Sequence, residues 1–270
     1  MINEQQRKIY ERIKNGEPVK LSFKYLSDEI LQLLNNILSR LLSKHDLQYT
    51  IYSLITILRE LLVNSFKANV KRIFFQKMNL DINDPVQYQS GIVKFKDEII
   101  GDFEILKEEV LSSENNIIFK IQEEKDAISF IVKNNVPVLS EEMKRINQRV
   151  AAASLHANFN DIYDSLEDDT EGAGLGIALI IMFLKSMGID PATFTIQSND
   201  NVTVASFMVP YQLKPHEIIT IVKKKILDEI SGLPTFPENI MALLQMCSNP
   251  DVEIEKVVKK IKMDVALTTD

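Results

Sequence analysis

The sequence predicts an α/β domain over residues 18–212, with a polar lead-in before it, residues 1–17, and an all-helical segment after it, residues 213–270. Up to Pro210, runs that alternate apolar and polar residues, as strands do, are interspersed with runs that have the three- or four-residue apolar spacing of helices. Beyond that point every run has helical spacing. This change of pattern predicts a domain boundary near residues 211–215.

Short apolar or alternating runs bounded by polar residues predict six strands. They cover residues 19–23, 73–77, 117–122, 127–133, 193–197 and 202–209. Helical spacing predicts the elements between and after the strands. The predicted helices are residues 26–42, 46–70, 140–156, a helix that residues 172–176 open and that ends near Gly188, then 216–230, 237–247 and 252–263. Residues 79–115 are predicted as a largely helical insertion between strands.

Charge and composition argue against several classes of function. The net charge of −7 is unfavourable for general nucleic-acid binding, which depends on a basic surface. The single cysteine excludes an internal disulfide, and His45, His156 and His216 do not have the spacing of zinc ligands. The longest apolar run, residues 175–184, is shorter than the roughly 20 residues of a membrane-spanning helix. We therefore expect a cytoplasmic protein that binds neither nucleic acid nor membranes.

Glycine is scarce and concentrated in this chain. Three of its 8 glycines, Gly172, Gly174 and Gly176, fall within five positions directly before an apolar helical run. Such a cluster predicts a backbone that needs conformational freedom. Glycines before a helix expose backbone N–H groups, and the helix N-terminus attracts anions, so the segment resembles a phosphate cradle. A plain turn is the alternative, and the segment is not a P-loop, because no Gly-Lys-Ser/Thr sequence follows.

A second cluster of polar side chains lies on the predicted helix 46–70 and just beyond it. Glu60, Asn64, Lys67 and Lys71 are spaced at i, i+4, i+7 and i+11, which places them on one helix face. An asparagine oxygen can bind Mg²⁺, a lysine can neutralise phosphate, and a glutamate can orient water. Taken alone, the same pattern is typical of a solvent-exposed helix face.

The two clusters are more specific in combination. A Glu-x-x-x-Asn helix, a strand that ends in a polar turn, a lid-like loop and a Gly-x-Gly-x-Gly helix follow one another, and two predicted strands close the domain. This order resembles the GHKL superfamily of ATP-binding domains over residues 18–210. Glu60–Asn64 would be its N box, and Gly172–Gly176 its second glycine box. The resemblance implies a Bergerat-type two-layer α/β sandwich, in which helices cover one face of a mixed sheet.

The resemblance also implies a role for each matching residue. Asn64 would hold Mg²⁺ against the phosphates of ATP or ADP, and Lys67 would contact a phosphate directly. Glu60 would act as a general base or position a water molecule. The segment that surrounds the phosphates would comprise a lid, residues 157–171, together with Gly172, Gly174, Leu175 and Gly176.

The chain departs from this pattern at the first glycine box. The superfamily usually has Asp-x-Gly-x-Gly after a strand, and the aspartate accepts a hydrogen bond from the adenine amino group. Here Asn134 occupies the aspartate position, and Val136 and Val138 replace both glycines. An asparagine oxygen can still accept a hydrogen bond from adenine, but without charge assistance. Valine adds a side chain where glycine permits a close approach.

The C-terminal segment has a resemblance of its own. Residues 233–268 contain Leu-Pro-x-x-Pro, a predicted helix, Asn-Pro-Asp, a second predicted helix and Asp-x-Ala-Leu-Thr. This order resembles the start of an HDOD domain, an all-helical bacterial signalling module that lacks the metal ligands of the related HD phosphohydrolases. Because the pattern stops at Asp270, we expect a truncated chain or a natural short form.

These patterns together predict a Mg²⁺-ATP-binding module of a bacterial signal-transduction protein. Its nucleotide state would change how the helical module meets a partner protein, with slow ATP hydrolysis or serine phosphorylation, as in anti-sigma-factor kinases, as enzymatic variants. The alternative is a protein-interaction scaffold that kept the fold and lost the nucleotide. Histidine autophosphorylation is not expected, because His45, the histidine upstream of the N box, lies between two predicted helices. The oligomeric state stays open, with a homodimer as one option.

Overall fold

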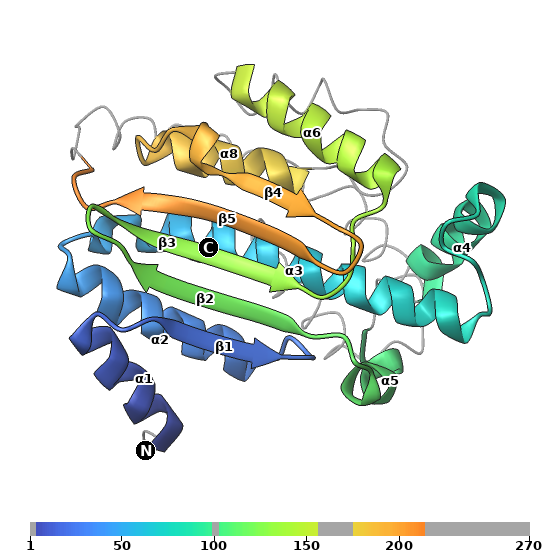
Figure 1. Cartoon of the computed structure of the whole chain (residues 1–270), viewed down its shortest axis with the longest axis horizontal. Coiled ribbons are helices and arrows are strands. Elements are labelled where there is room, and N and C mark those ends of the chain that lie inside the picture. Colours follow the sequence, from blue (N-terminus) through green and yellow to red (C-terminus); the bar gives the residue numbers. More distant parts are fainter. Residues whose placement is uncertain (1–3, 99–102, 156–174, 214–270) are drawn as a thin grey trace, which may run out of the picture.

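The computed structural model describes residues 4–98, 103–155 and 175–213, which form seven α-helices and five strands (Figure 1). The helices are α1 (Glu4–Asn15), α2 (Asp28–Lys44), α3 (Ile51–Lys77), α4 (Pro85–Glu98), α5 (Lys107–Ser112), α6 (Ser140–Leu155) and α8 (Leu175–Ser186). The strands are β1 (Val19–Phe23), β2 (Ile117–Glu123), β3 (Ala127–Asn134), β4 (Thr195–Ser198) and β5 (Thr203–Pro210). The predicted lid and the predicted helices beyond Leu213 lie outside the described residues.

The strands form one sheet in the order β1-β2-β3-β5-β4, and all four pairings are antiparallel. The prediction of a mixed sheet is therefore wrong for the part of the chain that the structure describes. Two of the pairs are hairpins, β2–β3 and β4–β5, whose short turns make them antiparallel. In the other two pairs longer segments separate the strands, α2 to α5 between β1 and β2, and α6, α8 and β4 between β3 and β5. Phe23, the last residue of β1, pairs with Ile117, the first of β2, and Asn134 at the end of β3 pairs with Thr203 at the start of β5.

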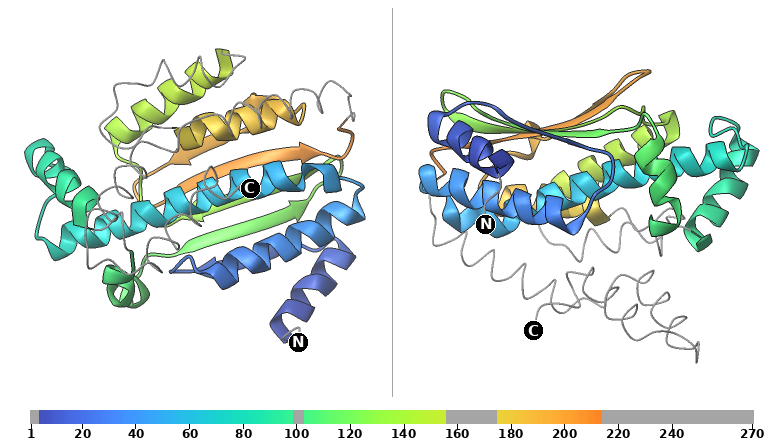
Figure 2. Two further views of the ribbon diagram at one scale, coloured as in Figure 1. Left: turned by 180° about the vertical axis from the view of Figure 1, so that it is seen from behind. Right: turned by 90° about the horizontal axis from the view of Figure 1, so that it is seen from below.

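Five of the six predicted strands are confirmed, with boundaries shifted by at most two residues. Seen from the side, the sheet forms one layer and α2, α3 and α8 lie on one side of it, as predicted (Figure 2). The side chains of β2 alternate between buried and partly exposed positions, because one face of the strand packs on the helices. Among the described helices, none is both long and apolar enough to cross a membrane.

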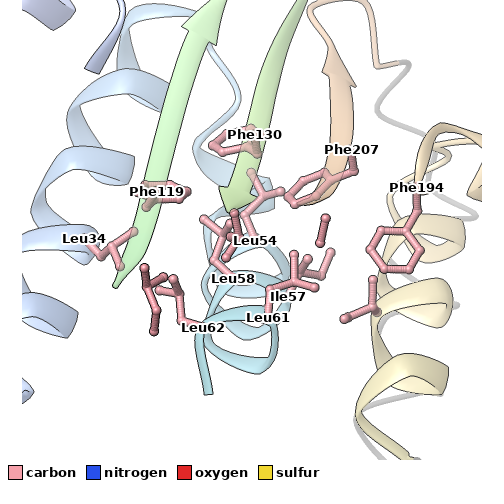
Figure 3. Close-up of a cluster of buried hydrophobic side chains, with 14 of the residues drawn as sticks. Leu34, Leu54, Ile57, Leu58, Leu61, Leu62, Phe119, Phe130, Phe194 and Phe207 are labelled. Carbon is pink, nitrogen blue, oxygen red and sulfur yellow. The ribbon is translucent and has the colours of Figure 1, made fainter. Parts of the chain in front are cut away.

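The core lies between the sheet and α3, which runs across the middle of the sheet (Figures 1 and 3). Phe119, Phe130 and Phe207 come from three adjacent strands and are fully buried, and the rings of Phe130 and Phe207 stack with centroids 5.0 Å apart. The helix contributes aliphatic side chains to the same cluster, namely Leu54, Ile57, Leu58, Leu61 and Leu62. This packing fixes the orientation of α3 and therefore of the polar side chains on its other face.

The predicted strand 73–77 is wrong, because these residues complete α3. Phe74 and Phe75 are both buried, although they point from adjacent positions of the helix in different directions. α4 covers this end of the helix, with Phe95 5.5 Å from Phe74 between ring centroids. A Cβ atom added at Gly91 of α4 would lie 2.5 Å from Cζ of Phe75, so the absence of a side chain there permits the close packing. Burial on two sides thus overrides the β-propensity of the run.

The turn after α2 is held to the β2–β3 hairpin. His45, predicted as a turn residue, caps α2, and its Nε2 lies 2.6 Å from Oε2 of Glu123. Nζ of Lys44 is 2.9 Å from Oε1 of the same carboxylate. The ring of Tyr211 stacks on His45 with centroids 4.4 Å apart. The segment that follows β5 therefore returns to the turn between α2 and α3.

Candidate functional site

The polar residues predicted on the helix 46–70 all lie on α3, so their spacing places them as expected. Asn64 is exposed, whereas Glu60 and Lys67 are partly buried. Lys71 has a different role, because its ammonium group forms an ion pair with Glu142 of α6. The candidate site on α3 therefore consists of Glu60, Asn64 and Lys67.

The first turn of α8 lies directly against this part of α3. A Cβ atom added at Gly176 would lie 2.5 Å from Oε2 of Glu60 and 3.6 Å from Nδ2 of Asn64. The structure therefore brings together the two sequence clusters, which are more than a hundred residues apart, and any side chain at position 176 would enter the space that Glu60 occupies. α8 begins at Leu175, and Gly172, Gly174 and the predicted lid lie outside the described residues.

Glu60 is the electrostatically unusual group of this site. Burial raises the pKa of its carboxyl above the ordinary value, and the positive charges of Lys67 and Arg59 offset only part of that effect. A raised pKa brings a carboxylate closer to the range in which it can accept and release a proton near neutral pH. Glu60 is therefore the described residue of this site that is best suited to proton transfer.

Asn134 lies at the end of β3 and is 3% exposed. Its Nδ2 donates a hydrogen bond to the backbone carbonyl of Ser65 on α3, at 3.2 Å. Its Oδ1 is buried and has no partner among the described residues. The backbone of α3 thus holds the carboxamide in place, and its oxygen stays available as an acceptor for a donor group of a ligand or of a water molecule.

Asn69 is a second buried carboxamide, which the sequence patterns did not single out. It lies one helical turn beyond Ser65 on α3 and is completely buried. Neither its Nδ2 nor its Oδ1 has a hydrogen-bond partner among the described residues. An unpaired buried polar group costs about 1–3 kcal/mol, so these atoms are expected to bind water or a ligand. A lone asparagine between the buried residues Phe66 and Val70 is the signal that could have identified it.

The segment that replaces the first glycine box is tied to its neighbours through backbone groups. The carbonyl of Val136 accepts a hydrogen bond from the hydroxyl of Thr203 at 2.7 Å, and the N–H of Val138 donates one to Ser198 at 2.9 Å. The guanidinium of Arg72 donates to the carbonyl of Pro137. Among the described residues other than glycine, positive φ angles occur at Asp46 and Asn79, so neither valine adopts the backbone conformation that favours glycine.

A buried ion-pair network joins α3 to the start of α6, and the sequence patterns did not predict it. Glu142 pairs with Lys71 and accepts a hydrogen bond from the N–H of Leu139 at 3.1 Å, and Arg72 lies 3.9 Å from the same carboxylate. Burial alone would raise the pKa of Glu142, but the charges of Lys71 and Arg72 and these hydrogen bonds outweigh it and hold the pKa below the ordinary value. Lysine and glutamate more than seventy positions apart give no sequence signal of pairing.

The donors available for a metal are few. Within the described residues, no group of three or more histidine, cysteine, aspartate or glutamate side chains is placed to hold a metal ion. Asn64 supplies a single carboxamide oxygen, so a Mg²⁺ ion at this site would need most of its oxygen ligands from phosphates and water, which is its usual coordination at nucleotides. The described residues fit Mg²⁺ that arrives with a nucleotide, and they do not fit a metal bound by protein alone.

The comparison with protein families concerns the C-terminal end. No family model of the GHKL superfamily matches the chain, so that resemblance remains a prediction for residues 18–210. Over 214 residues the chain is 30% identical to a protein of Treponema pallidum (strain Nichols) named only "Uncharacterized protein". The match covers 78% of this chain and 41% of that relative, so the chain spans less than half of the relative's length. No solved structure matches the chain. Residues 233–270 match the model of the HDOD domain, which confirms the resemblance predicted for this segment.

Proposed function

We propose that residues 18–212 bind Mg²⁺-ATP beside α3, with the start of α8 on one side and the end of β3 on the other. The observation that carries this proposal is the packing of Gly176 against Glu60 and Asn64. A helix whose first turn contains a glycine beside a glutamate, an asparagine and a lysine leaves its N-terminal N–H groups open to an anion. The free Oδ1 of Asn134 supports the proposal independently.

Each residue of the proposed site would have a distinct task. The carboxamide oxygen of Asn64 would bind Mg²⁺, and the ammonium group of Lys67 would neutralise phosphate charge. Asn134 would accept a hydrogen bond from the amino group of adenine. Leu175 and Gly176 would bring the helix N-terminus to the phosphates, with Gly172 and Gly174 preceding them in the chain.

Glu60 would position a water molecule or accept its proton, a task for which its raised pKa is suitable. Bound ATP would supply a transferable phosphoryl group. Slow hydrolysis follows if water is the acceptor, and a serine kinase of the anti-sigma type follows if a partner protein presents a hydroxyl group. We further propose that nucleotide binding is coupled to the HDOD segment, through which a bacterial signalling partner would sense it.

The competing function is that of a scaffold without nucleotide, which Val136 and Val138 favour. Their backbone groups are engaged by Thr203 and Ser198, so the segment is held by the β4–β5 hairpin. These hydrogen bonds would suit either a rigid scaffold or a rigid pocket for the adenine base. The two functions therefore differ in a measurable property, which is the affinity for nucleotide.

Isothermal titration calorimetry of the full chain with ATP and excess Mg²⁺ tests the proposal. Asn64→Ala is expected to weaken binding roughly tenfold to a hundredfold, as removal of a group that supports a bound metal commonly does. Asn36→Ala, an equivalent change at an exposed position of α2, is the matched control and should bind as the wild type does. Absence of binding at millimolar nucleotide would favour the scaffold, and unchanged binding by Asn64→Ala would refute the assigned Mg²⁺ ligand.

A further inference from the structure

An apolar groove lies between α2 and α3. The two helices pack side by side beneath the sheet (Figure 2). The groove has a volume of about 100 Å³. Two polar residues, Asn35 and Arg59, and five aliphatic side chains line it: Leu31, Leu34 and Leu38 of α2 and Ile55 and Leu58 of α3. Leu34, Leu38 and Leu58 are buried, whereas Leu31 and Ile55 are only partly buried, so the groove opens between these two residues.

The last described residues bring the chain to one end of this groove. Leu213 is 8% exposed, and its carbonyl accepts a hydrogen bond from the hydroxyl of Tyr49 at 3.3 Å. Tyr49 lies two residues before the start of α3, and Tyr211 stacks on His45 in the same turn. The residues that follow Leu213 therefore start at the N-terminal end of α3, where the groove between the two helices begins.

The sequence directly after this point has the composition of an amphipathic helix. Ile219, Val222, Ile226 and Ile230 are spaced by three or four residues, and Pro215 precedes the run at a position that suits the start of a helix. Fifteen helical residues, 216–230, would extend about 22 Å, at 1.5 Å per residue. The stretch from Tyr49 to Arg59, which includes the start of α3, is about 15 Å long on the same basis. A helix over residues 216–230 is therefore long enough to follow the whole groove.

Charge favours the same arrangement. Asp28 and Glu29 are exposed at the first turn of α2, which lies at the far end of the groove because α2 and α3 are joined by a short turn and run antiparallel. A helix that started at Leu213 would place the three lysines 223–225 about 15 Å along its axis, at that end of the groove. Surface pairs of this kind add little affinity, but they favour one direction of the helix over the other.

We propose that residues 216–230 of the same chain dock as an amphipathic helix in the groove between α2 and α3, with Ile219 in contact with Ile55 and Val222 in contact with Leu31. This interaction would hold the HDOD segment against the helical layer, on the side away from the sheet. It does not depend on the proposed nucleotide site. A second copy of the chain or a separate partner protein could also occupy an apolar groove.

Cysteine labelling of the full chain tests this docking. In a Cys247→Ser background, Ile55→Cys reports on the groove, and Met208→Cys, 41% exposed on β5, reports on the sheet. Adding Val222→Asp is expected to increase the rate of maleimide labelling at position 55 roughly tenfold or more, because it removes an apolar side chain that covers the groove. Labelling at position 208 should not change.

Lys224→Asp, on the predicted polar face of the same segment, is the matched control and should leave both rates as they are. Equal labelling of Ile55→Cys with and without Val222→Asp would overturn the proposal. Labelling that speeds up on dilution of the protein would also overturn it, since the groove would then be covered by a second copy. A circular-dichroism melt of each variant confirms that α2 and α3 remain folded.

Discussion

Glu60 combines partial burial with two nearby positive charges, and its pKa is nevertheless raised. In the unfolded chain the carboxyl ionises near its ordinary value of 4.5, whereas in the folded protein it ionises only at higher pH. The folded state thus binds the proton more tightly, so stability falls as pH rises through this interval. The sequence spacing identified Glu60, but the raised pKa depends on its burial in the folded protein, which the sequence alone does not show.

We therefore predict that Glu60→Gln raises the melting temperature increasingly as pH rises above about 4.5, because the wild-type carboxyl then ionises more readily in the unfolded chain than in the folded protein. Below about pH 4.5 the carboxyl is protonated in both states, and the difference should disappear. Thermal melts of wild type and Glu60→Gln between pH 4 and 8 measure this difference in melting temperature. Glu29→Gln is the control, and its effect on the melting temperature should have the opposite sign. The reason is that a hydrogen bond from Ser27 lowers the pKa of Glu29. A pH-independent difference for Glu60→Gln would contradict the account.

Gly176 allows function and stability to be separated. Alanine favours a helix by about 0.5–1 kcal/mol over glycine, so Gly176→Ala should leave the melting temperature unchanged or raise it. Its Cβ would displace the carboxylate of Glu60 and crowd Asn64, so Mg²⁺-ATP affinity should fall by about tenfold or more. Calorimetry and thermal melts on the same sample measure both quantities. Loss of stability without loss of affinity would show that the packing is only structural.

At the scale of elements, α3 determines most of the architecture and of the candidate site. Its apolar face packs on the sheet, and its polar face carries Glu60, Asn64 and Lys67. Its C-terminal end packs on α4 and is joined to α6 by an ion pair. The sequence predicted the helix as far as Val70 but not its last turns. The run 73–77 begins with three consecutive apolar residues, and periodicity cannot distinguish such a short run in a buried helix from a buried strand.

The ion pairs of Glu142 connect α3 with α6, the helix that precedes the predicted lid. The side chains of Lys71, Arg72 and Glu142 are all at most 15% exposed, so the loss of one charge leaves the others desolvated and unpaired. We predict that Glu142→Gln lowers the free energy of unfolding by about 3–5 kcal/mol. Urea denaturation measures this, with Glu141→Gln as the neighbouring control.

Glu141 pairs with Lys144 at the surface, so its substitution should have little effect on stability. Because the pKa of Glu142 is depressed, its stabilising contribution is present at neutral pH and is lost as pH falls through the folded-state pKa. The difference between wild type and Glu142→Gln should therefore shrink in acid. Equal destabilisation by the two variants would show that the buried network contributes no more than a surface pair.

For the molecule as a whole, the sequence predicts most elements and the β2–β3 hairpin, but not how strands that are distant in the chain pair. Hairpins and helix spacing are local patterns, whereas the pairing of β1 with β2 and of β3 with β5 depends on where long helical connections rejoin the sheet. The same limit applies to the candidate site. Glu60, Asn64 and Gly176 were identified because each belongs to a short motif, whereas Asn69 and Glu142 acquire their roles from residues that tertiary packing brings near.

The central claim is that one nucleotide site joins α3, the end of β3 and the start of α8. Amide hydrogen exchange of the full chain, with and without Mg²⁺-ATP, tests it most directly. We predict slower exchange in residues 60–70, 131–138 and 175–180 together, and no change in α4, which serves as an internal control. Unchanged exchange in these three segments at saturating nucleotide, or protection confined to another part of the chain, would contradict the account.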